Sequence, residues 1–113
     1  MLLHVDGRIE PEPGRVRVVH GGVVVADTTR ALCVREQGMP PRYYVPRDDL
    51  LVALAPSTTA SVCSWKGNAA YWSLPDVPDA AWSYDDPMDG ATELAGRVAF
   101  YASKVDEIRV DEV

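Results

Sequence analysis

Most of the side chains that could do chemistry lie in one ten-residue segment of the chain. Between Cys63 and Trp72 it holds a thiol, the ammonium of Lys66 and the aromatic rings of Trp65 and Tyr71. A thiolate is a nucleophile, and a neighbouring positive charge lowers the pKa of a thiol. If the protein is an enzyme, Cys63 is therefore the candidate catalytic residue, with Lys66 as the group that would activate it.

The sequence also offers a structural role for the same thiol, and favours it. No Cys-His-Asn or Cys-His-Asp signature is visible, and both histidines lie far from Cys63 in the sequence. Unassisted cysteines usually behave as small buried hydrophobic residues, as we expect of Cys33 in its apolar run. A chain that is 47% hydrophobic does not need a disulfide, so we expect free thiols. The sequence leaves open whether the protein is an enzyme.

A second group of residues suggests an anion-binding site. Arg42 and Arg47 flank a short aromatic run, and their guanidinium groups are suited to carboxylates and phosphates. Lys66 would add a point charge if its segment lay on a neighbouring strand. The alternative for Arg47 is an ion pair with Asp48, Asp49 or an aspartate in the second half of the chain. The expected ligand-binding residues combine cations with aromatic rings that can line a pocket: Arg42, Tyr44, Arg47, Trp65, Lys66 and Tyr71.

The metal-ligating side chains are widely spaced. His4, His20, Cys33 and Cys63 are enough in number for zinc, but structural zinc sites usually use closely spaced pairs, and the chain has none. Zinc is therefore not expected, and no metal ligand is assigned. A phosphoryl-transfer enzyme would instead need a carboxylate for Mg²⁺, for which the candidates are Asp48 and Asp86.

Length and charge limit the classes of protein and partner. A chain of 113 residues corresponds to one domain, here an extended N-terminal lead over residues 1–14 and a β-rich domain over residues 15–113. A formal net charge of −6 repels phosphate backbones and anionic lipid headgroups, so neither nucleic acid nor membrane is expected as a partner. Neither a leader peptide nor a long apolar run is visible, which predicts a cytoplasmic protein.

The hydrophobic pattern is that of short strands. Residues 16–20 alternate β-branched and polar side chains, Gly21-Gly22 suits a tight turn, and residues 23–25 return, which predicts a hairpin. Two short helical turns are expected, one after Pro46 and one within residues 89–96. Further strands are predicted at 31–36, 42–45, 50–53, 59–65, 69–73, 80–84, 97–102 and 108–110. Because strands alternate their faces, Tyr71 and Trp72 should point in opposite directions.

Five motifs follow one another along the chain. They are Tyr43-Tyr44-Val45-Pro46-Arg47-Asp48-Asp49, Leu54-Ala55-Pro56-Ser57, Cys63-Ser64-Trp65-Lys66-Gly67 with Tyr71-Trp72, Ala81-Trp82-Ser83-Tyr84 and Val98-Ala99-Phe100-Tyr101. Their order and spacing over about residues 15 to 110 resemble the domain of unknown function 427 family, catalogued as nucleotidyltransferase-like. The resemblance implies a compact, folded-over antiparallel sheet of the β-tent kind. It also implies a pocket beside the proline-arginine-aspartate turn and the cysteine-aromatic-lysine-glycine segment.

Three functions from different classes follow from these observations. The first, which we favour, is a pocket-bearing protein that binds a small anionic or planar molecule, such as a metabolite or a nucleotide. The second is an enzyme, either nucleotidyltransferase-like or dependent on Cys63. The third is a homodimeric structural or interaction domain that associates through an exposed edge strand or aromatic patch.

Overall fold

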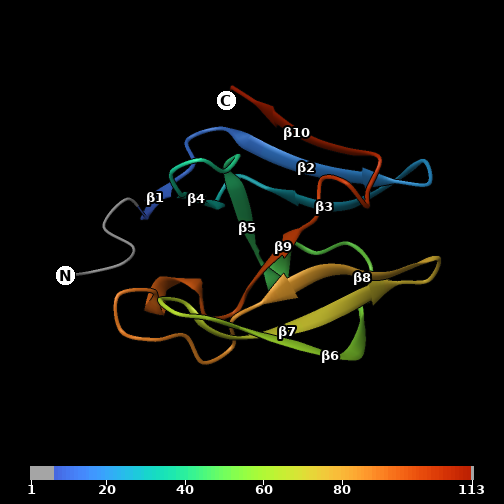
Figure 1. Ribbon diagram of the computed structural model, residues 1–113. Helices are drawn as coiled ribbons and strands as arrows, with labels where there is room; N and C mark the ends of the chain where they lie inside the picture. Colours follow the sequence, from blue (N-terminus) through green and yellow to red (C-terminus); the bar gives the residue numbers. More distant parts are fainter. Residues whose placement is uncertain (1–6, 113) are drawn as a thin grey trace.

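A computed structural model describes residues 7–112, which fold into two antiparallel sheets (Figure 1). The larger sheet has seven strands in the order β1-β4-β5-β9-β8-β7-β6, and the smaller has three in the order β10-β2-β3. In chain order the strands are β1 (Arg8–Pro11), β2 (Arg15–His20), β3 (Val23–Thr28), β4 (Leu32–Arg35), β5 (Arg42–Pro46), β6 (Ala55–Cys63), β7 (Gly67–Leu74), β8 (Val77–Ser83), β9 (Arg97–Phe100) and β10 (Glu107–Asp111). The expected mainly β, folded-over antiparallel architecture is confirmed.

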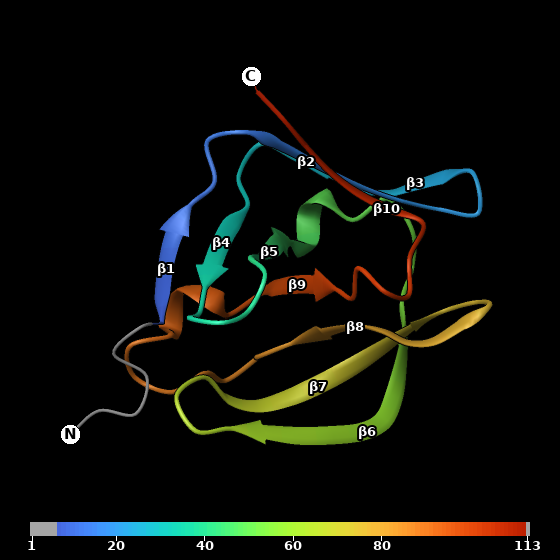
Figure 2. The same cartoon turned by 45° about the horizontal axis from the view of Figure 1, so that its top comes forward.

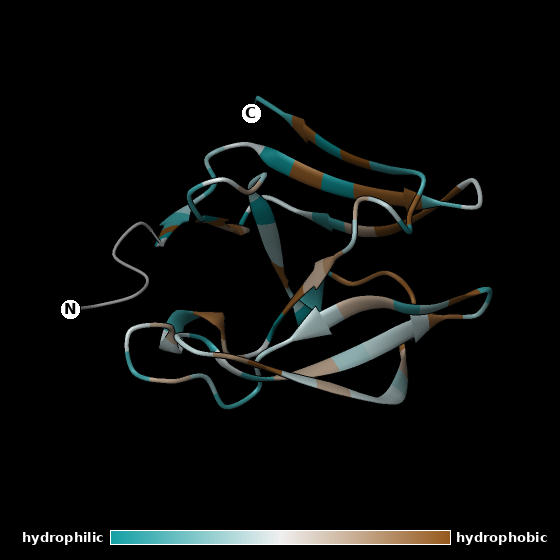
Figure 3. Ribbon diagram, viewed as in Figure 1, coloured by the Kyte–Doolittle hydropathy of each residue, from teal (hydrophilic) through white to brown (hydrophobic). Residues whose placement is uncertain are grey.

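The predicted hairpin is formed by β2 and β3. Gly21 and Gly22 make its turn with φ angles of 60° and 76°, a left-handed conformation that glycine adopts at little cost. Hydrophobic and hydrophilic residues alternate along β2 and β10, as Figure 3 shows. Val16 and Val18 on β2 are buried, because this period of two turns one face of the small sheet towards the large sheet.

Both helical turns occur where they were expected, as single 3-10 turns. They are η1 (Arg47–Asp49), directly after β5, and η2 (Thr92–Leu94). The strand expected at residues 50–53 is wrong, because only Leu50 forms a bridge, with Ala26 of β3. This segment connects η1 to β6, within the large sheet, and its hydrophobic side chains pack between the two sheets without a continuous backbone ladder. None of the helices within residues 7–112 is long and apolar enough to cross a membrane.

The large sheet is strongly bent. Figure 2 shows β1 and β4 running across the direction of β6, β7 and β8, with β9 and β5 between the two groups. In Figure 1 the small sheet lies above the end of the bent sheet formed by β7 and β8. Residues 8–11, part of the expected N-terminal lead, form β1 and pair with β4 at one edge of the large sheet. The nine-residue β6 forms the other edge.

Both faces of the central strands are buried, against different partners. On β5, Tyr44 and Val45 belong to opposite cores, as do Val98 and Ala99 on β9. The sandwich core lies between the two sheets and consists of Val18, Val25, Ala26, Val45, Leu74, Ala80, Ala81, Val98, Phe100 and Val105. The aromatic core lies on the other face of the bent sheet and consists of Val34, Tyr44, Ala69, Trp82, Tyr84, Ala91, Leu94 and Ala99.

Candidate ligand-binding site

Buried aromatic groups joined by polar contacts form the base of the candidate site. Tyr44 is fully buried on β5, and its hydroxyl accepts a hydrogen bond of 3.0 Å from the indole Nε1 of Trp82 on β8. The two rings meet edge to face, with centroids 6.1 Å apart and an interplanar angle of 87°. Burial raises the pKa of both Tyr44 and Tyr84 well above the ordinary tyrosine value. Tyr44 therefore shapes the site as a neutral, rigid hydroxyl.

Lys66 is buried beside this base and paired with a carboxylate. Its Nζ lies 2.9 Å from Oε1 of Glu36, whose other oxygen is 3.3 Å from the indole nitrogen of Trp65. The Lys66 side chain is 8% exposed. Gly67 follows with a φ of 117°, so the chain reverses immediately after the lysine, and the Lys66 carbonyl accepts a hydrogen bond from Met88. The turn and this hydrogen bond fix the main chain of Lys66, and Glu36 holds its ammonium.

Two cations act on the same carboxylate. Burial raises the pKa of Glu36, but the hydrogen bond and charge of Lys66 act against burial, with smaller contributions from Trp65 and Arg42. The net result is a pKa below the ordinary glutamate value. The guanidinium of Arg42 lies over the ring of Trp82, 5.5 Å from its centroid, and forms no ion pair with any residue of the described chain. Lys66, Arg42 and Glu36 together therefore carry a net charge of one positive unit.

A pair of tyrosines extends the aromatic surface towards solvent. The rings of Tyr71 and Tyr101 are nearly parallel, with centroids 6.4 Å apart, and Tyr71 also exchanges a hydrogen bond of 2.8 Å with Ser61. Tyr101 packs on Trp82 at 4.3 Å between ring centroids, and Nζ of Lys104 lies 5.2 Å from the Tyr101 ring. Burial, and the hydrogen bond with Tyr71, raise the pKa of Tyr101 to about 12. Half-buried aromatic rings here lie close to two cations, Arg42 and Lys104.

Next to these rings is a hollow of about 390 Å³, at the start of β5 and the end of β9. Its lining combines apolar walls with the guanidinium of Arg42 and two phenol rings: Pro40, Pro41, Arg42, Tyr43, Phe100, Tyr101, Ala102, Ser103 and Ile108. This volume lies in the range of small-molecule pockets. The hollow can therefore accept a small ligand whose anionic group faces Arg42.

Arg47 lies away from this group. Its Nη2 is 2.8 Å from Oδ1 of Asp85 and 3.2 Å from Oγ of Ser83, and its guanidinium covers the ring of Trp72 at 4.7 Å. Trp72 packs against the sandwich core, whereas Tyr71 packs against the aromatic core, so Arg47 is on the opposite face from Arg42. The structure shows the ion pair with an aspartate of the second half that was the alternative to ligand binding for Arg47, and it confirms the opposite placement of Tyr71 and Trp72.

The structure brings together five of the six residues expected to bind a ligand. The strand arrangement that does so differs from the expected one. Arg42, Tyr44, Trp65, Lys66 and Tyr71 all lie around the aromatic core. The Cys63 segment is not a neighbour of β5, because β9, β8 and β7 lie between β5 and β6. The bend of the sheet, rather than strand pairing, places Lys66 and Arg42 near the same carboxylate.

The two cysteines are free thiols in different settings. Cys33 is buried, and burial raises its thiol pKa. Cys63 is half-buried at the end of β6, opposite Gly67, and packs against the aromatic core. Lys66, the expected activator, directs its ammonium to Glu36.

Among the described residues, the histidine, cysteine and carboxylate side chains are not arranged as a metal site. Within residues 7–112, no group of three or more of them could hold a metal ion. His4 lies outside the described residues. Asp48 and Asp86, the carboxylates considered for Mg²⁺, are both exposed.

Glu36 and Lys104 are the functional candidates that sequence reasoning missed. Glu36 is 30 residues from Lys66 in the chain and belongs to no motif. Its one signal was indirect, since a buried lysine needs a counter-charge. Lys104 donates to the backbone carbonyls of Pro78 and Asp79, so its position depends on the fold of another segment.

One comparison with known proteins identifies the family. A family model described as a domain of unknown function (DUF427), with the label NTP_transf_9, matches residues 8–111. The match spans nearly the whole chain, and the protein belongs to this family, as the five motifs indicated. No curated protein matches the chain.

Proposed function

We propose that this protein binds a small molecule that carries both an anionic group and a planar ring, in the hollow beside Arg42 and Tyr101. The observation that carries the proposal is the charge imbalance of the site. Arg42 and Lys66 act on the single carboxylate of Glu36, and Arg42 lines a hollow with aromatic and proline walls. In a chain of net charge −6, such a positive site selects anions against the field of the whole molecule.

The anionic group and the planar ring of the proposed ligand would each contact different residues of the hollow. A guanidinium group makes charge-assisted, paired hydrogen bonds to carboxylates and phosphates. The phenol rings of Tyr43 and Tyr101 and the flat faces of Pro40 and Pro41 offer apolar area to a planar ring. A nucleotide unites a planar base with phosphate, and the family label names nucleotide chemistry, which makes nucleotides the first class to test.

Thermal unfolding with three related probes tests the proposal, because a ligand that binds the native state raises its stability by RT ln(1 + [L]/Kd). Adenosine monophosphate carries both features, adenosine lacks the anion, and ribose 5-phosphate lacks the planar ring. We expect the melting temperature to rise most with adenosine monophosphate. Equal effects of all three probes, or no effect of any, would contradict the proposal. Repeating the series with Mg²⁺ tests the enzyme alternative, since phosphoryl chemistry predicts metal-dependent binding.

A substitution pair locates the binding. Arg42→Gln should abolish most of the ligand-induced rise while changing the melting temperature of the free protein little, since Arg42 is half-buried and has no ion pair within the described chain. Arg109→Gln is the matched control, because Arg109 is exposed on β10 and paired with Asp111. An unchanged ligand effect in Arg42→Gln would place the site elsewhere.

A further inference from the structure

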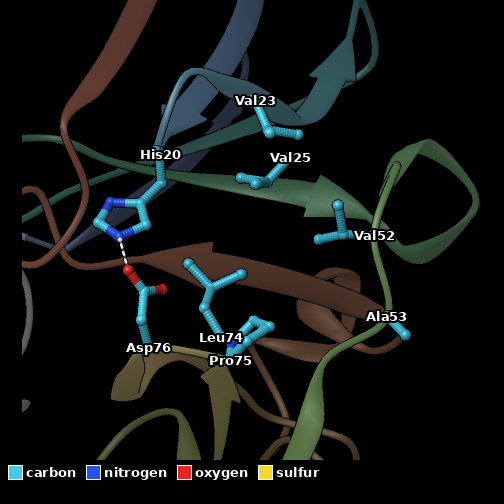
Figure 4. Close-up of a pocket in the computed structure, with 9 residues that line it drawn as sticks. His20, Val23, Val25, Val52, Ala53, Leu74, Pro75 and Asp76 are labelled. Carbon is cyan, nitrogen blue, oxygen red and sulfur yellow. Dashed lines mark hydrogen bonds and ion pairs between the residues drawn. The ribbon is translucent and has the colours of Figure 1, made fainter.

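A second cavity, of about 490 Å³, lies at the end of the sandwich where the β2–β3 turn approaches the β7–β8 turn. Figure 4 shows Val23, Val25, Val52 and Leu74 converging on this space from three separate segments. Val25 and Leu74 are buried, whereas Val23 is 51% exposed. An apolar ligand would remove the exposed valine surface from water, which contributes roughly 25 cal/mol for each Å² covered.

One wall of this cavity is polar and negatively charged. Nε2 of His20 lies 3.3 Å from Oδ2 of Asp76, as the dashed line in Figure 4 shows. Nδ1 of the same ring is buried without a hydrogen bond, 3.6 Å from Oδ1 of Asp106. The other Asp106 oxygen accepts a hydrogen bond of 2.9 Å from the backbone N–H of Gly21. The imidazole is thus held between two carboxylates from different loops.

The net charge of this wall is negative whether or not His20 is protonated. An imidazolium carries one positive charge against the two carboxylates of Asp76 and Asp106, and a neutral imidazole carries none. The side chain of Asp76 is 70% exposed and lines the cavity, so its free lone pairs can meet a ligand. A carboxylate or phosphate head would be repelled there, whereas an ammonium would be attracted.

We propose that this cavity is a second binding site, which takes a small hydrophobic amine. The aliphatic part of the ligand lies against Val23, Val25, Val52 and Leu74, and its ammonium pairs with Asp76. This site is chemically the reverse of the Arg42 hollow, because its walls are aliphatic and its charged group is a carboxylate. Binding here does not depend on the function proposed for the Arg42 hollow.

Three eight-carbon probes that differ only in their head groups test this inference by isothermal titration calorimetry of the full chain. We expect n-octylamine to bind roughly two- to fivefold more tightly than n-octanol, and n-octanoate to bind most weakly. Equal affinities for the three probes would overturn the role of Asp76. Absence of n-octylamine binding would overturn the site itself.

Two substitutions assign the binding to this cavity. Asp76→Asn should weaken n-octylamine binding roughly two- to fivefold and leave n-octanol unchanged. Asp89→Asn, at an exposed aspartate in the loop before η2, is the matched control and should change neither. Val52→Trp should fill the space from its half-buried loop position and weaken both ligands. If n-octylamine binding is unchanged in both Asp76→Asn and Val52→Trp, the amine binds elsewhere and the inference fails.

Discussion

On one face of strands β5, β8 and β9 the buried side chains are mostly aliphatic, whereas on the other they are aromatic and hydrogen-bonded. The aliphatic side faces the small sheet and forms the sandwich core around Val45 and Val98. The aromatic side faces the inside of the bent sheet, where Tyr44 accepts a hydrogen bond from Trp82 and Lys66 meets Glu36. Polar groups are buried on both sides, because the fully buried Ser83 accepts a hydrogen bond from Trp72 beside the sandwich core, but the ion pair of Lys66 and Glu36 lies on the aromatic side.

If the proposed function holds, this small β domain assigns stability and recognition to different faces. Aliphatic packing has no direction and tolerates many solutions of similar volume. Buried hydroxyl, ammonium and carboxylate groups need partners at defined distances, because an unpaired buried polar group is costly. The aromatic face has the stricter packing requirements, and it is also the face whose polar groups could contact a ligand. Substitutions on the two faces should therefore have different effects on stability and on its dependence on pH.

The largest effect is expected from truncating the sandwich core. Phe100→Ala should lower the free energy of unfolding by about 3–5 kcal/mol, because Phe100 is 3% exposed and its removal leaves a cavity. Its neighbour Tyr101 is half-buried on the aromatic side, so Tyr101→Ala should cost less. Urea denaturation of both variants measures the difference. A larger loss for Tyr101→Ala would contradict the assignment of stability to the sandwich core.

A smaller effect that depends on pH is expected on the aromatic face. Glu36→Gln should cost about 2–3 kcal/mol at neutral pH, because it leaves the buried ammonium of Lys66 without its counter-charge. The depressed pKa of Glu36 means that the wild-type advantage is present above the ordinary glutamate pKa, about 4.3. As the pH falls through the lower, folded-state pKa, the wild-type carboxylate is protonated too and the advantage disappears.

Urea denaturation of wild type and Glu36→Gln across the acidic range checks this prediction. The two stability curves should converge as the pH falls. A difference between them that stays constant from neutral to acidic pH would show that Glu36 acts through packing rather than through charge. Lys66→Met combined with Glu36→Gln is the control, because it removes both charges and should recover much of the loss.

The smallest effect is expected at Arg47. The Arg47–Asp85 pair is solvent-exposed, with side chains 36% and 52% exposed, so Arg47→Gln should cost only about 0.2–1 kcal/mol. Because Arg47 is on the opposite face from Arg42, this substitution should also leave ligand stabilisation intact. Loss of ligand binding in Arg47→Gln, measured by the same thermal assay, would show that the two arginines act on one site.

The parts of the fold that depend on local pattern could be predicted from the sequence. The β2–β3 hairpin, the turn after Pro46 and the opposite faces of Tyr71 and Trp72 follow from a period of two and from turn residues that lie next to each other. The strand prediction for residues 50–53 was wrong because their hydrophobic side chains pack between the two sheets. Such burial gives the same sequence pattern as a strand, without backbone pairing.

The candidate site depends on information that local pattern lacks. The strand order puts β6 at an edge, with three strands between it and β5, and it is the bend of the sheet that brings Lys66 near Arg42. Glu36 could not be matched to Lys66 across 30 residues without that geometry. Residue types therefore indicated which side chains to consider together, whereas their contacts and the boundaries of the site required the three-dimensional fold.

The most direct test of the account is to map where an anionic, planar probe binds. In a ¹H–¹⁵N NMR titration with adenosine monophosphate, we expect the shifted resonances to cluster at Arg42, Tyr43, Tyr101 and the other residues that line the hollow, with Val25 and Leu74 at the other end of the sandwich unaffected. The Arg42→Gln variant should lose these shifts. Shifts that centre on residues away from the hollow, or that persist unchanged in Arg42→Gln, would contradict the proposal that the hollow beside Arg42 is the recognition site of this protein.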